Sequence, residues 1–254
     1  MIVIKSAKDI EIMKKAGAIA AGARALAGSM VRPGVELRQI DRAVHQFILS
    51  HGAKATFLGY GGYPTSCCLS VNEVVIHGIP GNQVLKEGDI VSVDVGATFQ
   101  GFVGDCADTF PCGAISEEDE ALIRDTRQSF WEAFKIMREG YRIGDIGAAV
   151  ESYCRSRGYG VVWEYTGHGV GRAMHEDPAI PNLGPAGHGA RLRPGMTIAV
   201  EPMICQGTGD VHRLSDGWTV KTKDGKKSAH YENTVWITHS DPVILTALAE
   251  KPIR

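Results

Sequence analysis

The chain has 254 residues, of which 44% are hydrophobic, and a formal net charge of −2. A chain of this size can bury a sizeable core, and lengths up to about 250 residues commonly form one domain, so we expect a single domain over residues 1–254. The near-neutral charge excludes a strong field, and charge alone therefore predicts neither nucleic-acid nor membrane binding.

The N-terminal segment MIVIKSAKDIEIMKK lacks the apolar segment of roughly 7–15 residues that defines a signal peptide. No apolar run approaches the roughly 18 residues of a membrane span, since Arg24 interrupts the alanine-rich stretch 16–27. The six cysteines contain no C-x-x-C pair, and the adjacent Cys67 and Cys68 suit neither a zinc knuckle nor a disulfide framework. These features predict a cytoplasmic protein with reduced thiols and no membrane contact.

Two helices are predicted near the start of the chain. Ser6 and Asp9 resemble a capping box that opens a helix over residues 6–29, and the sequence VRPG ends it. A second helix over residues 36–50 has a continuous apolar face, and Gly52 is its expected stop.

This layout recurs in the middle of the chain, with helices predicted over residues 116–138 and 144–157. The segment RPGVELRQIDRAVHQFILSHG of the first copy aligns without gaps on REGYRIGDIGAAVESYCRSRG of the second, at an offset of 106 residues. Such a repeat predicts an α+β fold of two related halves, approximately residues 1–112 and 113–254, each with two helices and a β-ribbon.

Each half also contains a strand that begins after a glycine and ends in an acid. GDIVSVD ends at Asp94 and GMTIAVE ends at Glu201, at an offset of 107 residues. These two acids are therefore equivalent positions, which we expect to meet at a central site. Glu201 has the alternative of a surface position before Pro202, but a lone carboxylate buried in this apolar strand would cost several kcal/mol.

Asp94 and Asp105 lie on the two strands of a predicted hairpin. If Phe99 and Gln100 form its turn, the two aspartates face each other on one side of the ribbon. Two carboxylates about 5 Å apart repel each other unless a cation lies between them. A solvated polar face is the alternative, and it explains a single aspartate better than a facing pair. The same pattern places Asp108 on the opposite side.

Glu232 lies on a predicted strand, residues 228–238, that returns after the lysine-rich hairpin 221–227. The pair Asp224-Gly225 is a type I′ turn signal in that hairpin. Each half therefore supplies one acid on an outgoing strand and one on a returning strand.

Three histidines stand beside glycine or an acid at the ends of apolar runs. His168 and His175 belong to TGHGVGRAMHEDP, and His77 belongs to VVIHGIP. A single histidine is more often a satisfied core or surface residue than a ligand. Three in this setting favour a functional site.

Four carboxylates and one imidazole form an oxygen-rich ligand set. This set suits manganese, iron, cobalt or zinc in a carboxylate-bridged pair better than a thiolate zinc site. Four negative ligands also neutralise two divalent cations, which favours two ions. Such a pair can share a hydroxide, lower its pKa toward neutrality and polarise the carbonyl that it attacks.

These residues stand in motifs that resemble a known family over nearly the whole chain. The motifs are YGGYPTSCCLSVNEVVIHGIP, GDIVSVDVG, GDCADTF, TGHGVGRAMHEDP, MTIAVEPM and DGWTVKTKDGKKSAHYENTV. Their order and spacing resemble the type I methionine aminopeptidases, compact members of the pita-bread metallopeptidase family M24. The resemblance implies a pita-bread fold with two pseudo-symmetric halves around a central dinuclear metal site. It also implies removal of the N-terminal methionine from nascent proteins and peptides when the second residue is small.

The resemblance also implies a role for each ligand. Asp94 would be a bidentate ligand of one metal, Asp105 and Glu232 would bridge, and His168 and Glu201 would complete the second metal. A metal-bridging hydroxide would attack the carbonyl of the first residue, with Glu201 as proton shuttle.

By the same resemblance, His175 would stabilise the oxyanion, and His77 would hydrogen-bond near the scissile amide and the leaving nitrogen. The free α-amine would bind at the metal centre, which makes the activity that of an aminopeptidase. The positions that match the substrate pocket are Phe57, Tyr60, Tyr63, Cys68, His77, Met174, His175 and Trp218. A methionine thioether packs well on such aromatic and sulfur-containing side chains.

Two positions depart from the family pattern: Gly61 stands where relatives often have histidine, and Met174 where they often have phenylalanine. Both departures affect the shape of the pocket. Asn72, Val74 and Ser228 match a site that binds a monovalent cation in relatives.

Two other functions remain as alternatives. A proline-specific peptidase of the same fold is disfavoured by the methionine-like pocket and by the missing N-terminal domain. A non-catalytic binding protein on this scaffold is disfavoured by the intact ligands.

The expected partners are peptides and nascent chains that begin with methionine, and the protein is expected to act as a monomer. The cluster Lys221, Lys223, Lys226 and Lys227 has two interpretations. It would either dock near the ribosomal exit, where nascent chains emerge, or form a solvated hairpin, which we favour.

Overall fold

The computed structural model describes residues 1–248 and combines helices with antiparallel strands, which confirms the predicted α+β class. The helices are α1 (Ala7–Met30), α2 (Leu37–Ser50), α3 (Glu117–Phe134), α4 (Ile143–Arg155) and the short 3₁₀ helix η1 (Tyr60–Gly62). The strands are β1 (Lys54–Ala55), β2 (Cys68–Val71), β3 (Val74–Ile76), β4 (Ile90–Phe99), β5 (Phe102–Pro111), β6 (Gly160–Val161), β7 (Gly167–Gly169), β8 (Glu176–Ile180), β9 (Thr197–Val200), β10 (Met203–Cys205), β11 (Val211–Arg213), β12 (Val220–Thr222), β13 (Ser228–His230), β14 (Glu232–Trp236) and β15 (Val243–Ile244).

The helices begin where their caps predict. The Ser6 hydroxyl accepts a hydrogen bond from the Asp9 N–H at 3.3 Å, and the Asp9 carboxylate accepts one from the Ser6 N–H at 3.0 Å, which confirms the capping box of α1. Helices α2 and α4 begin at residues 37 and 143, a separation of 106 that equals the offset of the sequence repeat.

Helix α3 ends four residues earlier than predicted, at residue 134 rather than near 138. The N–H groups of Ile136 and Met137 donate to carbonyls three residues earlier, which turns the chain and buries Met137 completely. Gly140 then adopts a φ of 97°, which continues the turn.

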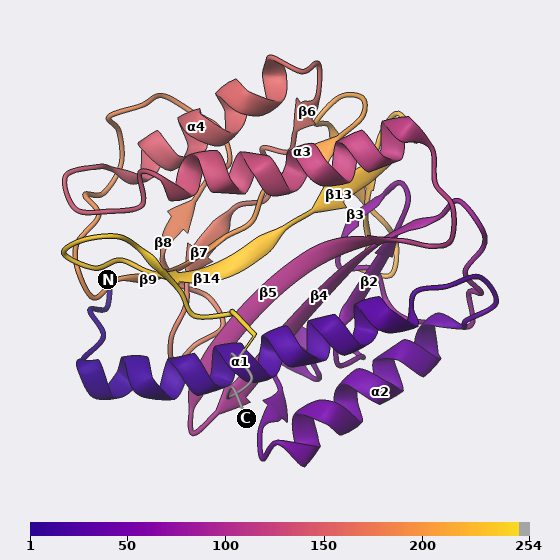
Figure 1. Cartoon of the computed structure of the whole chain (residues 1–254), viewed down its shortest axis with the longest axis horizontal. Coiled ribbons are helices and arrows are strands. Elements are labelled where there is room, and N and C mark those ends of the chain that lie inside the picture. Colours follow the sequence, from indigo (N-terminus) through magenta and orange to yellow (C-terminus); the bar gives the residue numbers. More distant parts are fainter. Residues whose placement is uncertain (249–254) are drawn as a thin grey trace, which may run out of the picture.

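The largest sheet of the described residues has nine strands, in the order β1-β4-β5-β14-β9-β7-β8, with β2 on β4 and β15 on β14. Two antiparallel strand pairs form its centre, the hairpin β4–β5 and the pair β9–β14, and they meet where β5 pairs with β14. One strand of each half therefore lies on either side of this central seam (Figure 1). Two smaller sheets follow the orders β13-β10-β6 and β11-β12-β3.

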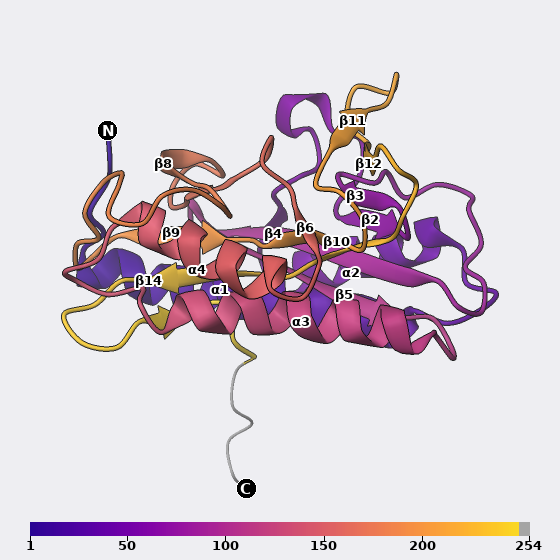
Figure 2. The same ribbon diagram turned by 90° about the horizontal axis from the view of Figure 1, so that it is seen from above.

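The helices are divided between the halves. Helix α1 packs on β4, β5 and α2, whereas α3 packs on α4 and β13 (Figure 1). Two large apolar clusters follow this division, one under α1 and α2 and one under α3 and α4. Figure 2 shows α3 on one side of the molecule and β11 with β12 on the other. No helix within residues 1–248 has the length and apolarity to cross a membrane.

The turn of the first hairpin differs from the prediction. Phe99 pairs with Phe102, so the turn residues are Gln100 and Gly101, whose φ values of 48° and 79° suit a type I′ turn. Asp94 therefore faces Ala107 rather than Asp105. The predicted pairing of Asp94 with Asp105 is therefore wrong by two residues. Because side chains alternate between the faces of a strand with a period of two, both carboxylates still lie on the same side of the ribbon.

The second predicted hairpin also needs correction. Of Asp224 and Gly225, only Gly225 has a positive φ, 73°, so the turn is not type I′. The predicted return strand 228–238 is divided at Tyr231 into β13 and β14, which belong to different sheets.

Candidate metal centre

Neighbouring strands of the large sheet place the acidic side chains in two rows on one face. In the first row, Ala107 on β5 pairs with Asp94 on β4 and with Glu232 on β14. Glu201 directly follows β9, the next strand along, whose last residue is Val200. An alanine between two acids leaves open space above the sheet for a ligand.

The second row lies one pleat repeat further along the same face. Asp105 on β5 pairs with Gly96 on β4, and His168 on β7 pairs with Ala199 on β9. Thr234 on β14 holds the backbone of Asp105, because its hydroxyl accepts from the Asp105 N–H at 3.1 Å and donates to the Asp105 carbonyl at 2.9 Å. The sheet register therefore fixes the direction of this carboxylate.

The acids of both rows carry buried oxygen atoms that no protein group satisfies. Asp94 Oδ1, Asp105 Oδ1 and Glu232 Oε1 lack a hydrogen-bond partner within the described residues. Unpaired buried carboxylate oxygens are rare, because each costs several kcal/mol of desolvation. A cation bound among them would remove that cost.

The pKa values of the acids follow from this burial. Burial raises the pKa of Asp94 to about 7. It also raises the pKa values of Asp105, Glu201 and Glu232 well above their ordinary ranges, and the charges of the neighbouring acids raise them further. Like charges at close range disfavour ionisation unless a positive charge lies among them. The four acids are therefore suited to hold cations.

His168 presents a lone pair to the acids. Its Nδ1 lies 2.9 Å from the Gly169 carbonyl, which accepts a hydrogen bond from it and leaves Nε2 as the free nitrogen. Nε2 lies 3.7 Å from both Asp105 Oδ2 and Glu201 Oε1. Burial lowers the pKa of His168 to about 4, so the ring is neutral at pH 7.

Two groups of ligand atoms emerge from this geometry. One atom from each of Asp105, His168 and Glu232 lies within 4.8 Å of the others, and Asp94, His230 and Glu232 form a second group with the same limit. Glu232 belongs to both groups. Carboxylates and imidazoles with orphaned atoms at this spacing fit two divalent cations bridged by a shared acid.

An apolar pocket opens beside the acids. Its lining includes every predicted pocket residue, His77, His175 and all five predicted ligands. The pocket has a volume of about 140 Å³. A cavity of similar size admits a benzene ring, so a single side chain of medium length fits.

Three predicted residues hold the polar side of this pocket. Tyr60 Oη and His175 Nδ1 are joined by a hydrogen bond of 2.7 Å, and the ring of His175 lies 4.2 Å from that of His168. The ring of His77 meets that of Trp218 edge to face at 6.1 Å. Burial lowers the pKa of His77 to about 4 and also lowers that of His175.

Of the two departures from the family pattern, Met174 lines the pocket and Gly61 lies beside the pocket residue Trp218. Gly61 adopts a φ of 55°, and a Cβ there would lie 3.2 Å from the Trp218 ring. Met174 is buried in the pocket lining with Phe57 and Tyr63.

Sequence reasoning missed several residues of the site. Ile76, Tyr165 and Thr166 line the pocket, and His230 joins the second ligand group. A signal for His230 existed, because it stands two residues before Glu232 and thus shares its strand parity.

The remaining predicted residues lie outside the pocket. The Ser228 hydroxyl lies 3.3 Å from the Asn72 carbonyl and 3.2 Å from the Val74 carbonyl, so the three predicted cation-site residues are neighbours. Lys221 forms an ion pair of 2.6 Å with Glu73, and Lys227 one of 2.8 Å with Asp119, whereas Lys223 and Lys226 are exposed.

Comparisons with known proteins agree with this site. Residues 11–239 match metallopeptidase family M24. The methionine aminopeptidase of Clostridium perfringens is 47% identical over 98% of this chain and all of its own length, and methionine aminopeptidase 1 of Bacillus subtilis is 44% identical over 97% and 99%. The solved methionine aminopeptidase structure from Thermotoga maritima superposes with a TM-score of 0.95 at 44% identity, covering 97% of this chain and 99% of that one.

More distant structures share the fold alone. A prolidase from Pyrococcus furiosus has a TM-score of 0.78 at 22% identity, and the match covers 98% of this chain but 66% of the prolidase. The sequence repeat, the two central strand pairs and these neighbours together show the pita-bread fold. The chain therefore belongs to metallopeptidase family M24.

Proposed function

We propose that this chain is a methionine aminopeptidase, a hydrolase that removes the N-terminal methionine from peptides and nascent proteins with a small second residue. The observation that carries the proposal is the combination of buried, unpaired acids with an apolar pocket of side-chain size directly beside them. The near full-length similarity to methionine aminopeptidases supports the same activity.

We further propose that Asp94, Asp105, His168, Glu201 and Glu232 hold two divalent cations, with cobalt, manganese, iron and zinc as the candidates. The presence of Glu232 in both ligand groups supports its role as a bridge. When bound, such cations lower the pKa of a water molecule and polarise a carbonyl group. Asp94 belongs to one ligand group and Asp105 to the other, so each would help to hold one of the two cations.

The protein residues would act on protons and charge. Glu201 would accept a proton from the attacking water and pass it to the leaving nitrogen, as its place among the ligand residues that line the pocket suggests. His175, oriented by Tyr60, would stabilise the oxyanion, and His77 would donate a hydrogen bond near the scissile amide. The apolar pocket would take the methionine side chain, because aromatic and sulfur-containing groups line it.

Peptide hydrolysis tests this function. The purified protein, loaded with each candidate metal, should release methionine from Met-Ala-Ser and should leave Ala-Pro peptides intact. A chelator should abolish the release, and added metal should restore it. Cleavage of Ala-Pro peptides alone would favour a proline-specific peptidase. No hydrolysis at any metal loading would favour a non-catalytic binding protein.

We also infer that residues 1–254 act as one catalytic domain and as a monomer, and that the protein works in the cytoplasm. The sheet that runs through both halves supports one domain, and six free, buried cysteines suit a reducing compartment. The carbonyls of Asn72 and Val74 beside the Ser228 hydroxyl support a monovalent cation site at these three residues.

A ribosome contact through Lys221, Lys223, Lys226 and Lys227 remains a prediction. Two of these lysines are held in ion pairs within the chain, so Lys223 and Lys226 are the better probes. Charge reversal of both should weaken co-sedimentation with ribosomes and leave peptide turnover intact. Unchanged co-sedimentation would favour the solvated hairpin.

A further inference from the structure

His230 lies beside the acids, although sequence reasoning assigned it no role. Its backbone is fixed on both sides by Thr109, whose hydroxyl accepts from the His230 N–H at 3.0 Å and donates to the His230 carbonyl at 2.9 Å. The side chain is only 2% exposed. The ring is therefore held in one place, and its direction is set by the sheet rather than by solvent.

The free nitrogen of this ring points at two acids and has no hydrogen-bond partner. His230 Nε2 lies 3.7 Å from Glu201 Oε2 and 3.8 Å from Glu232 Oε2, and it is an unsatisfied buried atom. Both distances are too long for a hydrogen bond. Atoms that share an ion at about 2.1 Å lie roughly 3–4 Å from one another, which is the spacing found here.

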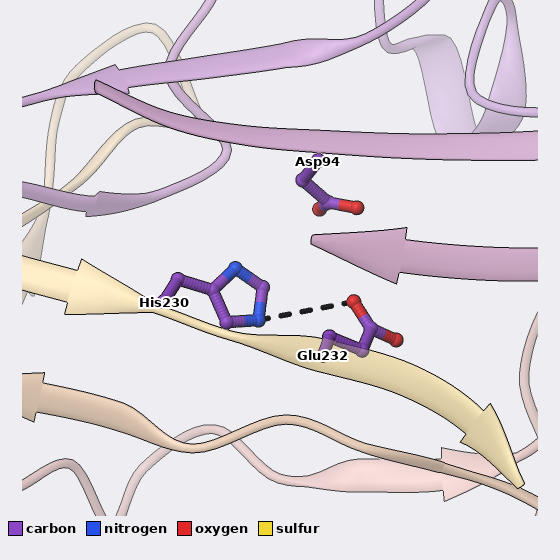
Figure 3. Close-up of side chains that lie close together, drawn as sticks. All are labelled: Asp94, His230 and Glu232. Atoms are coloured by element: carbon purple, nitrogen blue, oxygen red, sulfur yellow. Dashed lines mark ion pairs between the residues drawn. The ribbon is translucent and has the colours of Figure 1, made fainter. Parts of the chain in front are cut away.

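Figure 3 shows the side chains of Asp94, His230 and Glu232 turned toward one another from β4, β13 and β14. One potential ligand atom of each lies within 4.8 Å of the other two. Asp94 Oδ1 and Glu232 Oε1, which lack hydrogen-bond partners, belong to the carboxylates of this same group. Three unsatisfied side chains therefore converge on one point.

His168 provides an internal comparison on the other side of Glu201. Its Nε2 lies 3.7 Å from Glu201 Oε1, just as His230 Nε2 lies 3.7 Å from Glu201 Oε2. The two imidazoles thus face the two oxygens of one carboxylate. A histidine that occupies the same relation to the acids as an expected ligand has the geometry of a ligand itself.

We propose that His230 is a sixth protein ligand of the centre and binds the cation held by Asp94 and Glu232. This inference rests on the proposed dinuclear centre. Each of the two cations then has one imidazole ligand, His168 for one and His230 for the other. A nitrogen ligand at both positions favours cobalt, iron or zinc over magnesium, which prefers oxygen ligands alone.

Paramagnetic NMR of the Co²⁺-loaded protein tests this assignment directly. A histidine bound to Co²⁺ gives strongly shifted imidazole resonances, which ¹⁵N-histidine labelling identifies. Wild-type protein with two equivalents of Co²⁺ should show two such rings, and His230→Gln should show one. His168→Gln should remove the other ring. His212→Gln is the matched control, because His212 is exposed on β11, and it should retain both rings.

Co²⁺ titration against a chelator gives a second measurement. His230→Gln should weaken one of two binding steps by at least about tenfold, since even groups that only support ligands act on this scale. One shifted ring in the wild-type protein, or two in His230→Gln, would overturn the inference while the metal centre stands. No shifted ring in the wild-type protein would overturn the dinuclear centre as well. The wild-type count decides the question if His230→Gln does not fold.

Discussion

Asp94 carries an electrostatic cost whenever no cation is bound. Burial raises its pKa from 3.8 to about 7, and the charge of Arg24 only partly offsets this effect. At a pH between these two pKa values, the folded protein keeps a proton on Asp94 that the unfolded chain releases. The stability of the metal-free protein therefore falls as the pH rises from about 4 to 7, because ionising the buried group costs about 4 kcal/mol in total.

Asp94→Asn should thus have opposite effects on stability and activity. At pH 8 in the presence of a chelator, we expect the free energy of unfolding to rise by about 2–4 kcal/mol, since the amide carries no charge. With metal present, kcat/KM for a methionine peptide should fall at least about 100-fold. Urea unfolding and peptide release measure the two quantities.

Asp108→Asn is the matched control on the same hairpin, because Asp108 forms an ion pair of 2.7 Å with Arg127 outside the centre. This variant should lose a little stability rather than gain it. A loss of metal-free stability in Asp94→Asn would contradict the electrostatic account.

His77 affects the stability of the metal-free protein with a dependence on pH opposite to that of Asp94. Burial, together with the nearby His175, lowers its pKa from 6.5 to about 4. At a pH between these two pKa values, His77 of the unfolded chain binds a proton that the folded protein excludes. The stability contribution of the neutral ring is therefore complete above pH 6.5 and is lost as the pH falls toward 4.

His77→Gln should remove this part of the pH dependence. From pH 7 to pH 5 the wild-type protein should lose about 2 kcal/mol of unfolding free energy that the variant retains. Chemical unfolding of both proteins, without metal, gives the difference. Parallel pH profiles would show that His77 titrates normally.

At the scale of single elements, the β4–β5 hairpin presents two glycines on opposite faces. A Cβ on Gly96 would lie 2.6 Å from the Phe57 ring in the pocket, whereas a Cβ on Gly104 would lie 2.4 Å from the backbone nitrogen of Gly17 in α1. The first glycine makes room for a pocket side chain. The second allows the helix to approach the sheet closely.

Alanine at these two positions should separate binding from stability. Gly96→Ala should displace the Phe57 ring and lower kcat/KM about tenfold, mainly through KM. Gly104→Ala should lower the free energy of unfolding by about 1–3 kcal/mol and leave KM unchanged, because a helix backbone cannot move aside as easily as a ring. Steady-state kinetics and urea unfolding check both. An equal rise in KM for the two variants would show that substrate binding does not depend on which face of the hairpin carries the added methyl group.

The same hairpin shows what sequence alone predicts. Strand periodicity placed Asp94 and Asp105 on one face, because period two survives a shift of two residues. It misplaced the turn by one residue, because it assigned Phe99 and Gln100 to the turn, whereas Gly101, which readily adopts its positive φ of 79°, is the second turn residue. Parity with Glu232 was a weak signal for His230, because the chain changes sheets at Tyr231 and sequence pattern does not specify the pairing between distant strands that brings His230 to the acids.

At the scale of the whole molecule, the centre joins the two halves. Asp94 and Asp105 come from one half, and His168, Glu201 and Glu232 come from the other. The halves also meet along the β5–β14 seam, where two pairs of residues are in register, and in a smaller sheet where β3 pairs with β12. Bound cations would therefore act as cross-links between two cores as well as catalytic groups.

Metal binding should raise the melting temperature of the whole chain. Each ion at about 100 times its Kd stabilises the folded state by about 2.7 kcal/mol. For a domain of this size each kcal/mol shifts Tm by roughly 2–4 °C, so two ions should raise Tm by roughly 10–20 °C. Glu232→Gln should lose most of this shift, because Glu232 belongs to both ligand groups. Glu73→Gln, which removes only a surface ion pair with Lys221, should keep it. Differential scanning calorimetry with and without Co²⁺ measures the shift, and an equal shift in both variants would show that the stabilising ions bind elsewhere.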